Sequence, residues 1–216
     1  MRVALSLILI FCARAAMACG AAICIVDAEA LALSRLISFE DTRAGLGPGH
    51  QVDGLLVLEG ARFGDHFAGQ TVVQAGDFDQ IEGTPLKPLT LVAEDKRTGL
   101  ALVYMSGNTV LNGYGAAGFP RRHAQGEGAI AWMFDEDQSA ISFQLRGGEG
   151  GEARAQFLRR DGSEIATLAL GPLGEGEIGF ARAGGVGDIA GVVITNTDPQ
   201  GLALDNLRFG RAPDLS

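Results

Sequence analysis

The chain is poor in the positive charge and the long apolar runs that two classes of protein need. Its 17 Lys and Arg are outnumbered by 26 Asp and Glu, which gives a formal net charge of −9. Nucleic acid and anionic membrane surfaces are bound through clustered Lys and Arg, so this balance argues against both as partners. The apolar run at residues 3–12 is too short to cross a bilayer, which takes about 20 residues. We therefore expect no integral membrane anchor.

Signatures of common enzyme classes are also scarce. The three histidines, His50, His66 and His123, show no metal-ligand spacing with one another or with Cys, so a zinc hydrolase has no support. No Gly-x-Ser-x-Gly elbow is present. Two facing carboxylates can hydrolyse a glycoside, but a sequence does not show which carboxylates face each other. We predict no catalytic residue, and a jelly-roll polysaccharide hydrolase stays open as an alternative.

The N-terminus has the features of a secretory signal peptide over residues 1–18. Arg2 supplies the positive start, an apolar stretch follows, and Ala16-Met17-Ala18 places small residues before a cleavage site. A chain with this segment is expected to be secreted or periplasmic. Removing the segment also removes one of the three cysteines, Cys12.

The two remaining cysteines, Cys19 and Cys24, are predicted to form a disulfide, as is common in exported proteins. The loop between them is short, so the bond constrains the unfolded chain little and mainly protects the N-terminus. Two alternatives stay open: Cys19 is the lipid-anchored first residue of the mature chain, or neither modification occurs.

The rest of the chain predicts an all-β protein. One short helix is expected over residues 27–35 with Asp27 as its N-cap. Beyond it, apolar and polar residues alternate with a period of two, and 32 glycines punctuate the chain. This predicts an antiparallel β-sandwich of jelly-roll type over residues 36–210, preceded by a disulfide-bearing segment at 19–35 and followed by a tail at 211–216. The expected strands, about ten in number, lie near 36–40, 54–59, 89–93, 99–104, 129–134, 140–146, 153–159, 164–170, 177–182, 189–195 and 201–209.

Two long stretches, 64–88 and 105–128, lack strand character and are candidate binding surfaces. The second combines flat apolar rings with hydrogen-bond donors, a mixture that suits a glycan or, through its two arginines, an anion. The alternative is that Phe119 and Pro120 only anchor a long loop. Trp132 lies within an apolar run and is expected in the core. The candidate ligand-binding residues are Tyr114, Phe119, Arg121, Arg122 and His123.

Acidic segments near the two ends of the β-region suggest that its first and last strands lie together. The segments are Ser38-Phe39-Glu40-Asp41 and Leu204-Asp205-Asn206-Leu207-Arg208-Phe209, with Ala129–Asp135 and Ile141–Phe143 between them. With these motifs the chain resembles the calcium-bearing jelly-roll sandwiches of the galactose-binding-like type, found in carbohydrate-binding modules and in exported bacterial proteins with sorting anchors. The resemblance implies a structural calcium shared by Glu40 and Asp205, because carboxylate oxygens are calcium ligands. Alternatively, both are solvated charges at strand ends.

Together these features predict an exported, non-catalytic β-sandwich module with a structural calcium. Its expected partner is a glycan or a component of the cell envelope, by analogy with the fold. Besides the hydrolase, a purely structural envelope protein remains an alternative.

Overall fold

The computed structural model describes residues 19–93, 99–148 and 150–211. The predicted signal peptide, and the predicted tail beyond Arg211, lie outside this range. No helix within the range is long and apolar enough to cross a membrane.

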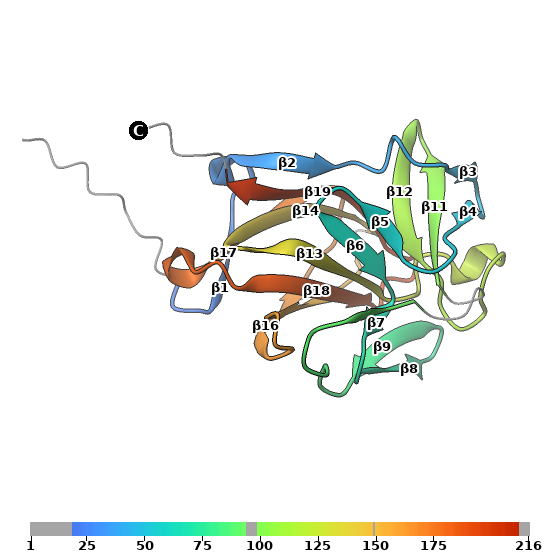
Figure 1. Ribbon diagram of the computed structural model, residues 1–216. Coiled ribbons are helices and arrows are strands. Elements are labelled where there is room, and N and C mark those ends of the chain that lie inside the picture. The colour runs from blue at the N-terminus through green and yellow to red at the C-terminus, as the bar shows by residue number, and fades with distance from the viewer. Residues whose placement is uncertain (1–18, 94–98, 149, 212–216) are drawn as a thin grey trace, which may run out of the picture.

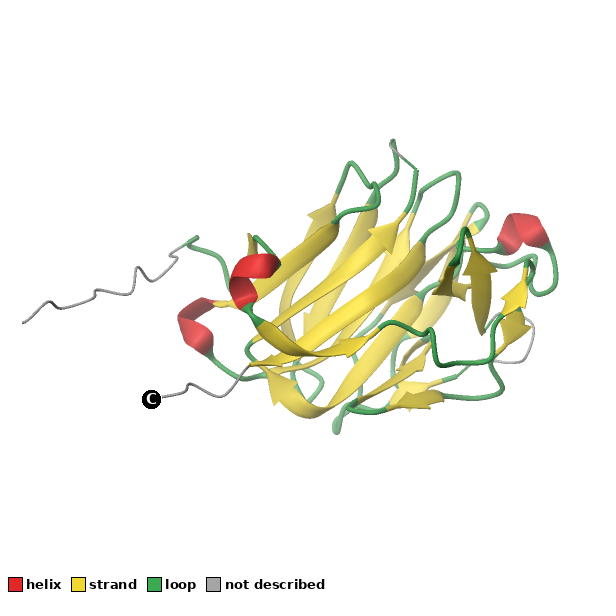
Figure 2. Cartoon of the chain, turned by 90° about the horizontal axis from the view of Figure 1, so that it is seen from above, coloured by secondary structure: helices red, strands yellow, loops and turns green. Residues whose placement is uncertain are grey.

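Eight strands form the framework of two facing antiparallel sheets (Figures 1 and 2). One sheet contains the order β2–β19–β14–β17 and the other contains β13–β18–β15–β16. Taken along the chain these are strands 1-8-3-6 and 2-7-4-5, the order of a jelly roll, so the predicted fold class is confirmed. Their bounds are β2 (Leu33–Ile37), β13 (Ile130–Gln138), β14 (Ala140–Arg146), β15 (Ala153–Leu158), β16 (Glu164–Leu170), β17 (Glu177–Arg182), β18 (Ile189–Asn196) and β19 (Ala203–Arg211).

Further strands extend both sheets. The first sheet gains β1 (Ile23–Val26) beside β17, and the hairpin of β11 (Leu100–Met105) and β12 (Asn108–Gly113) beside β19. Two short strands, β3 (Gly45–Leu46) and β4 (His50–Gln51), pair with β11. The second sheet gains β5 (Leu56–Leu58) and β6 (Ala61–Gly64) beside β13.

A segment that we call the excursion, residues 65–92, leaves the second sheet and packs on its outer face. It contains β7 (His66–Phe67), the hairpin of β8 (Thr71–Ala75) and β9 (Phe78–Glu82), and β10 (Leu91–Val92). Figure 1 shows the β8–β9 hairpin next to β18 and β7. Phe67, Leu89 and Leu91 of the excursion form a hydrophobic cluster with outward-facing residues of the sheet, among them Leu158 and Val193.

The predicted helix at 27–35 is wrong. A single 3-10 turn, Glu29–Leu31, is followed by Ala32 in the left-handed conformation (φ 48°), and β2 begins at Leu33. Asp27 does accept a hydrogen bond from the backbone N–H of Glu29, at 3.1 Å. Leu33, Arg35 and Ile37 instead sit opposite β19, so pairing with a distant strand outweighs a weak local helix preference.

All eleven predicted strands overlap observed ones, but the two stretches predicted to lack strand character are wrong in part: 64–88 contains β7, β8 and β9, and 105–128 contains β12. After its first residue every position of β12 is buried, on both faces of the sheet. A strand buried on both faces shows no polar alternation, and this removes the signal that identified the others.

The core lies between the two sheets and is rich in aromatic rings. The Phe143 ring stacks on Phe180 at 4.7 Å between centroids and meets Trp132 edge-on at 5.2 Å. Trp132 is fully buried, as predicted. Burying such rings supplies much of the stabilisation of a domain.

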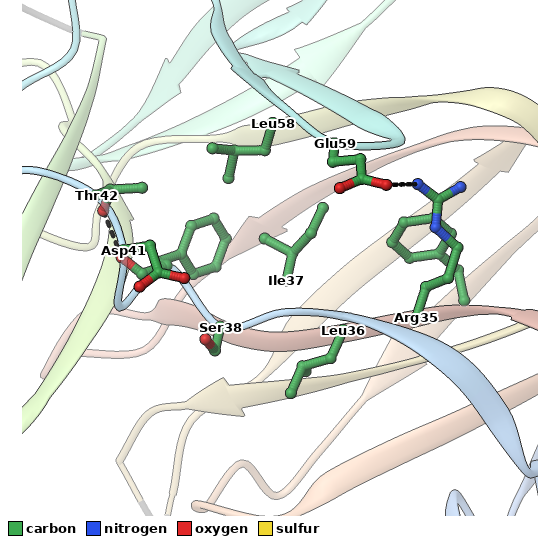
Figure 3. Close-up of a pocket in the computed structure, with 10 residues that line it drawn as sticks. Arg35, Leu36, Ile37, Ser38, Asp41, Thr42, Leu58 and Glu59 are labelled. Atoms are coloured by element: carbon green, nitrogen blue, oxygen red, sulfur yellow. Dashed lines mark hydrogen bonds and ion pairs between the residues drawn. The ribbon is translucent and has the colours of Figure 1, made fainter.

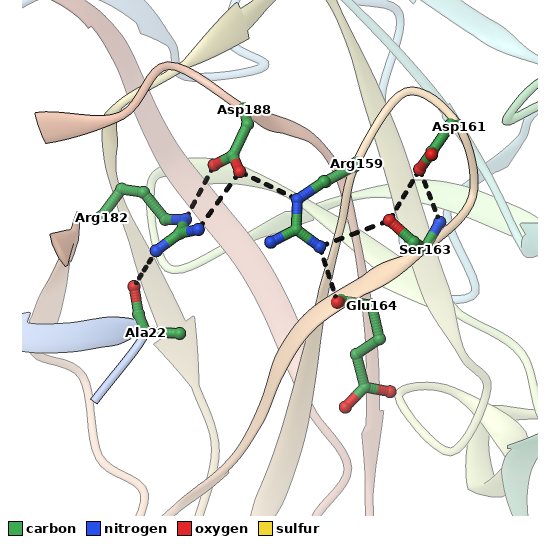
Figure 4. Close-up of polar contacts among 7 residues, drawn as sticks. All are labelled: Ala22, Arg159, Asp161, Ser163, Glu164, Arg182 and Asp188. Atoms are coloured by element: carbon green, nitrogen blue, oxygen red, sulfur yellow. Dashed lines mark hydrogen bonds and ion pairs between the residues drawn. The ribbon is translucent and has the colours of Figure 1, made fainter. Parts of the chain in front are cut away.

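Charged side chains attach the N-terminal segment to this core (Figure 4). Asp188 accepts hydrogen bonds from Arg182, at 2.7 and 3.2 Å, and from Arg159, at 2.9 Å. Arg182 also donates to the backbone carbonyl of Ala22. Burial opposes ionisation of Asp188, but the bonds from the two arginines outweigh it and lower the pKa of this carboxyl. Nearby, the predicted disulfide joins Cys19 and Cys24.

Candidate functional site

Asp205 lies at an irregular point of β19 where its neighbouring strand changes. On one side β19 pairs with β14 throughout, but on the other it pairs first with β12, at Leu204, and then with β2, from Leu207. Between these two positions the strand is bulged, and Asn206 takes a left-handed conformation (φ 47°). A short polar residue such as Asn tolerates this conformation. The predicted adjacency of the first and last framework strands is therefore confirmed.

The bulge brings Asp205 and Glu40 into one neighbourhood. The fully buried Asp205 carboxylate accepts hydrogen bonds from the Asn108 amide, at 2.5 Å, and from the Asn206 backbone, at 2.7 Å. Glu40, in the turn after β2, accepts the backbone N–H of Thr109, the residue next to Asn108, at 2.8 Å. The start of β12 thus links the two acidic residues.

Burial is the main cause that raises the pKa of Asp205, and the charge of Glu40 adds to it. The bonds from Asn108 and Asn206 and the nearby Arg146 act in the opposite direction. A buried carboxylate in this state is stabilised in its ionised form by any cation that approaches it.

The donor set suits a hard cation held by oxygen atoms. Two carboxylates and the side-chain amide of Asn108 are ligands of the type that calcium takes. Among the residues described, no group of three or more His, Cys, Asp or Glu is placed to hold a metal. A calcium here would therefore depend on Glu40, Asp205 and neutral oxygens.

The predicted ligand-binding loop is organised differently from the expectation. Tyr114 is fully buried, its hydroxyl donates to the Pro48 carbonyl at 2.5 Å, and its ring meets Phe119 edge-on at 5.4 Å. Burial raises the pKa of Tyr114 to about 12, although nearby Arg122 lowers it. The Tyr114 ring is thus no stacking surface for a sugar, and that part of the prediction is wrong.

The remaining loop candidates lie at the surface. Arg122 donates to the Gly47 carbonyl at 2.9 Å, which ties the loop to the segment between β3 and β4. Arg121 and His123 are exposed, and Phe119 is half-buried beside Tyr114. These contacts match the alternative in which Phe119 anchors a long loop.

A polar groove on the outer face of the second sheet was not predicted. Two adjoining pockets of about 270 and 310 Å³ share Arg154 and Thr195 and together follow the direction of β15 and β18. Strand register builds the floor from two cross-strand rows, Ala169–Arg154–Thr195 and Thr167–Gln156–Val193. Residues Gln80 and Ile81 of β9 form the wall, and the Gln80 amide bonds to the carbonyl of Asn196.

The groove offers hydroxyl, amide and guanidinium groups. Arg154 is exposed at its centre, with Thr195, Thr167, Gln156 and Gln80 around it. The other polar residues of its lining are Glu152, Glu164, Asn196 and Thr197. The described lining contains no aromatic side chain.

The two acidic residues of the groove belong to different rows of its floor. The Glu152 backbone carbonyl bonds to Thr197, four residues along β15 from Gln156, whose amide holds the Glu164 carboxylate at 2.7 Å. At 3.3 Å per residue the backbones of Glu152 and Gln156 lie roughly 13 Å apart along the strand. Glu152 and Glu164 therefore lie toward opposite ends of the groove floor.

The signal for this groove was present in the sequence but incomplete. In β15, Arg154 and Gln156 alternate with buried Ala153, Ala155 and Phe157, so their outward direction was predictable. The wall beside Arg154 and Gln156 was not predictable, because it is formed by β9, about 75 residues earlier in the chain.

A separate pocket, apart from the groove, opens at the flank of the sandwich (Figure 3). It has a volume of about 340 Å³ and lies between β2 and the end of β5. Ile37, Phe39 and Leu58 line its apolar part, and Arg35 pairs with Glu59 at 3.5 Å at one end. The other end is the turn at 38–42 that carries Glu40, so the cation candidate and this pocket share a structural element.

No protein-family model, curated protein or solved structure matched the chain.

Proposed function

We propose that this protein is an exported, non-catalytic binding module that holds a glycan in the groove on its second sheet. The observation that carries the proposal is the largely polar groove floor centred on Arg154 and Thr195 and bounded by β9. Sugars present many hydroxyl groups, and each needs a donor or acceptor when it leaves water. The side chains of the groove supply both kinds.

The composition of the groove also sets the expected strength of binding. Hydrogen bonds exchanged with water contribute only about 0.5–1.5 kcal/mol each, or somewhat more to a charged group. Without an aromatic ring in the described lining, we expect weak to moderate affinity that depends strongly on Arg154.

A structural calcium at Glu40 and Asp205 belongs to the same proposal. The cation would neutralise a buried carboxylate and hold together β2, β12 and β19, which meet at that point. It lies on the first sheet, whereas the groove lies on the second, so we assign it a role in stability and not in ligand binding.

The test is a glycan array with the mature protein, followed by calorimetric titration of the glycans that bind. Arg154→Ala should weaken binding about tenfold or more, and Thr195→Val should weaken it severalfold. Arg43→Ala, which removes an exposed arginine from the turn region after β2, is the charge-matched control and should leave binding unchanged.

Two results would count against the proposal. One is the absence of any bound glycan in calcium-containing buffer. The other is binding that survives Arg154→Ala but is lost in Arg121→Ala, which would move the site to the 105–128 loop.

A further inference from the structure

The groove has two different ends, and the difference follows from strand register. Its floor consists of successive rows across β15 and β18, spaced about 7 Å apart because side chains of one face recur every second residue. From one end to the other the rows contain Glu152 and Thr197, then Arg154 and Thr195, then Gln156 and Val193.

The next row, Leu158 with Gly191, is covered by the excursion. Leu158 is fully buried although it faces outward from the core, because it packs with Phe67 and Leu89. A Cβ added at Gly191 would lie 2.6 Å from the Phe67 ring, so only a glycine lets that ring approach the sheet so closely. A ligand chain lying in the groove has no path beyond Gln156 in this direction.

Hydrogen bonds across the strands reinforce the closed end. Gln70 of the excursion donates to Gln156 at 2.8 Å, and Gln156 donates to Glu164 at 2.7 Å. These three side chains run from the excursion over β15 to β16, at right angles to the groove. Of the three, Gln156 and Glu164 line the pocket and offer polar atoms to a group that stops at this point.

The opposite end is open to solvent. Glu152 and Thr197 are exposed, as is Ala169 in the neighbouring row. Among the described residues, none of those named here closes this end, so a ligand in the rows of Arg154 and Gln156 can continue outward past Glu152.

We propose that the groove recognises the end of a glycan chain rather than an internal segment. The terminal unit lies at the closed end against Gln156 and Glu164, the next unit lies over Arg154 and Thr195, and the rest of the chain leaves past Thr197. This inference rests on the proposed glycan-binding function.

The decisive measurement is the stoichiometry of binding to polymers of different length. Size-fractionated soluble β-glucan, xylan and mannan, each in a short and a roughly tenfold longer fraction, are titrated with the wild-type protein. End recognition predicts the same number of protein molecules per polymer chain for both fractions. A number that rises about tenfold with chain length would overturn end recognition and leave glycan binding intact, whereas no binding to any of the three polymers would overturn both.

Variants at the two ends give an independent readout with short oligomers of the polymer that binds. Gln156→Ala, at the closed end, should weaken the disaccharide and the hexasaccharide alike, by about tenfold. Thr197→Ala, at the open end, should weaken only the hexasaccharide, which is long enough to reach it. The opposite pattern, with Thr197→Ala weakening the disaccharide and Gln156→Ala leaving it unchanged, would refute the assigned direction.

Discussion

Replacing Asp188 by Asn tests whether the two-arginine network stabilises the fold. In the native protein Asp188 holds Arg182 and Arg159 through bonds of 2.7, 3.2 and 2.9 Å, with side-chain exposures of 20%, 12% and 35% for Asp188, Arg182 and Arg159. Hydrogen bonds to charged groups contribute roughly 1.5–3 kcal/mol, and partial exposure reduces this. Asn keeps one acceptor but leaves two neighbouring cations without an anion. We expect a loss of about 2 kcal/mol at pH 7.

For a domain of this size that loss corresponds to a fall in Tm of about 4–8 °C. The dependence on pH follows from the lowered pKa of Asp188. A carboxyl with a depressed pKa in the folded state contributes its stability above the unfolded-state value of about 3.9, and loses it as the pH falls through the folded-state value. The difference between wild type and variant should therefore be full at pH 6–8 and shrink below about pH 4.

Urea unfolding of both proteins between pH 3 and pH 8 measures this difference. Asp137→Asn is the matched control, because Asp137 bonds a single arginine, Arg160, at 2.6 Å in a more exposed position. An exposed pair of this kind should contribute less than about 1 kcal/mol. Equal losses in the two variants, or an Asp188→Asn loss that does not diminish in acid, would refute the reasoning.

Two further predictions concern Asp205 and Tyr114. Calcium should raise the Tm of the wild-type protein by several degrees over its value in chelator. Asp205→Ala should abolish this response, and Glu136→Ala, an exposed acidic control, should retain it. A wild-type Tm that does not respond to calcium would rule out the cation site. Tyr114→Phe leaves the Pro48 carbonyl without its donor and should cost about 1–2 kcal/mol at pH 8. The pKa of Tyr114, about 12, exceeds the unfolded value near 10, so the buried phenol contributes stability below pH 10 that is lost as the pH rises toward 12. Urea unfolding should therefore show a steeper alkaline loss of stability for the wild type than for the variant. Parallel pH profiles of the two proteins would contradict this.

Where the sequence predicted strands correctly, one face of each strand meets the core and the other meets water or another layer. Ile141, Phe143 and Leu145 of β14 show this alternation, and they are buried as expected. The failures at 33–37 and at β12 arise because a local sequence pattern does not show tertiary contacts. The segment at 33–37 became a strand because β19 pairs with it, and β12 escaped notice because both of its faces are covered.

The candidate sites divide in the same way. The proximity of Glu40 and Asp205 was predictable because acidic residues stand out among apolar ones at the two ends of the β-region, and a jelly roll brings its first and last strands together. The aromatic loop was misjudged because an isolated Tyr-Gly or Phe-Pro pattern does not show whether a ring points inward. Tyr114 points inward, where Pro48 accepts its hydrogen bond.

The amino-acid pattern by itself determined the class of fold, most of its framework strands and the pairing of its cysteines, because alternation and spacing are local properties of a chain. The tertiary structure alone decided where the groove forms. The groove exists because residues 65–92 fold back over half of a sheet that is formed mostly by residues far later in the chain. Which outward-facing residues such a segment covers, and which it leaves open beside Arg154, depends on packing between distant parts of the chain, and no local pattern encodes it.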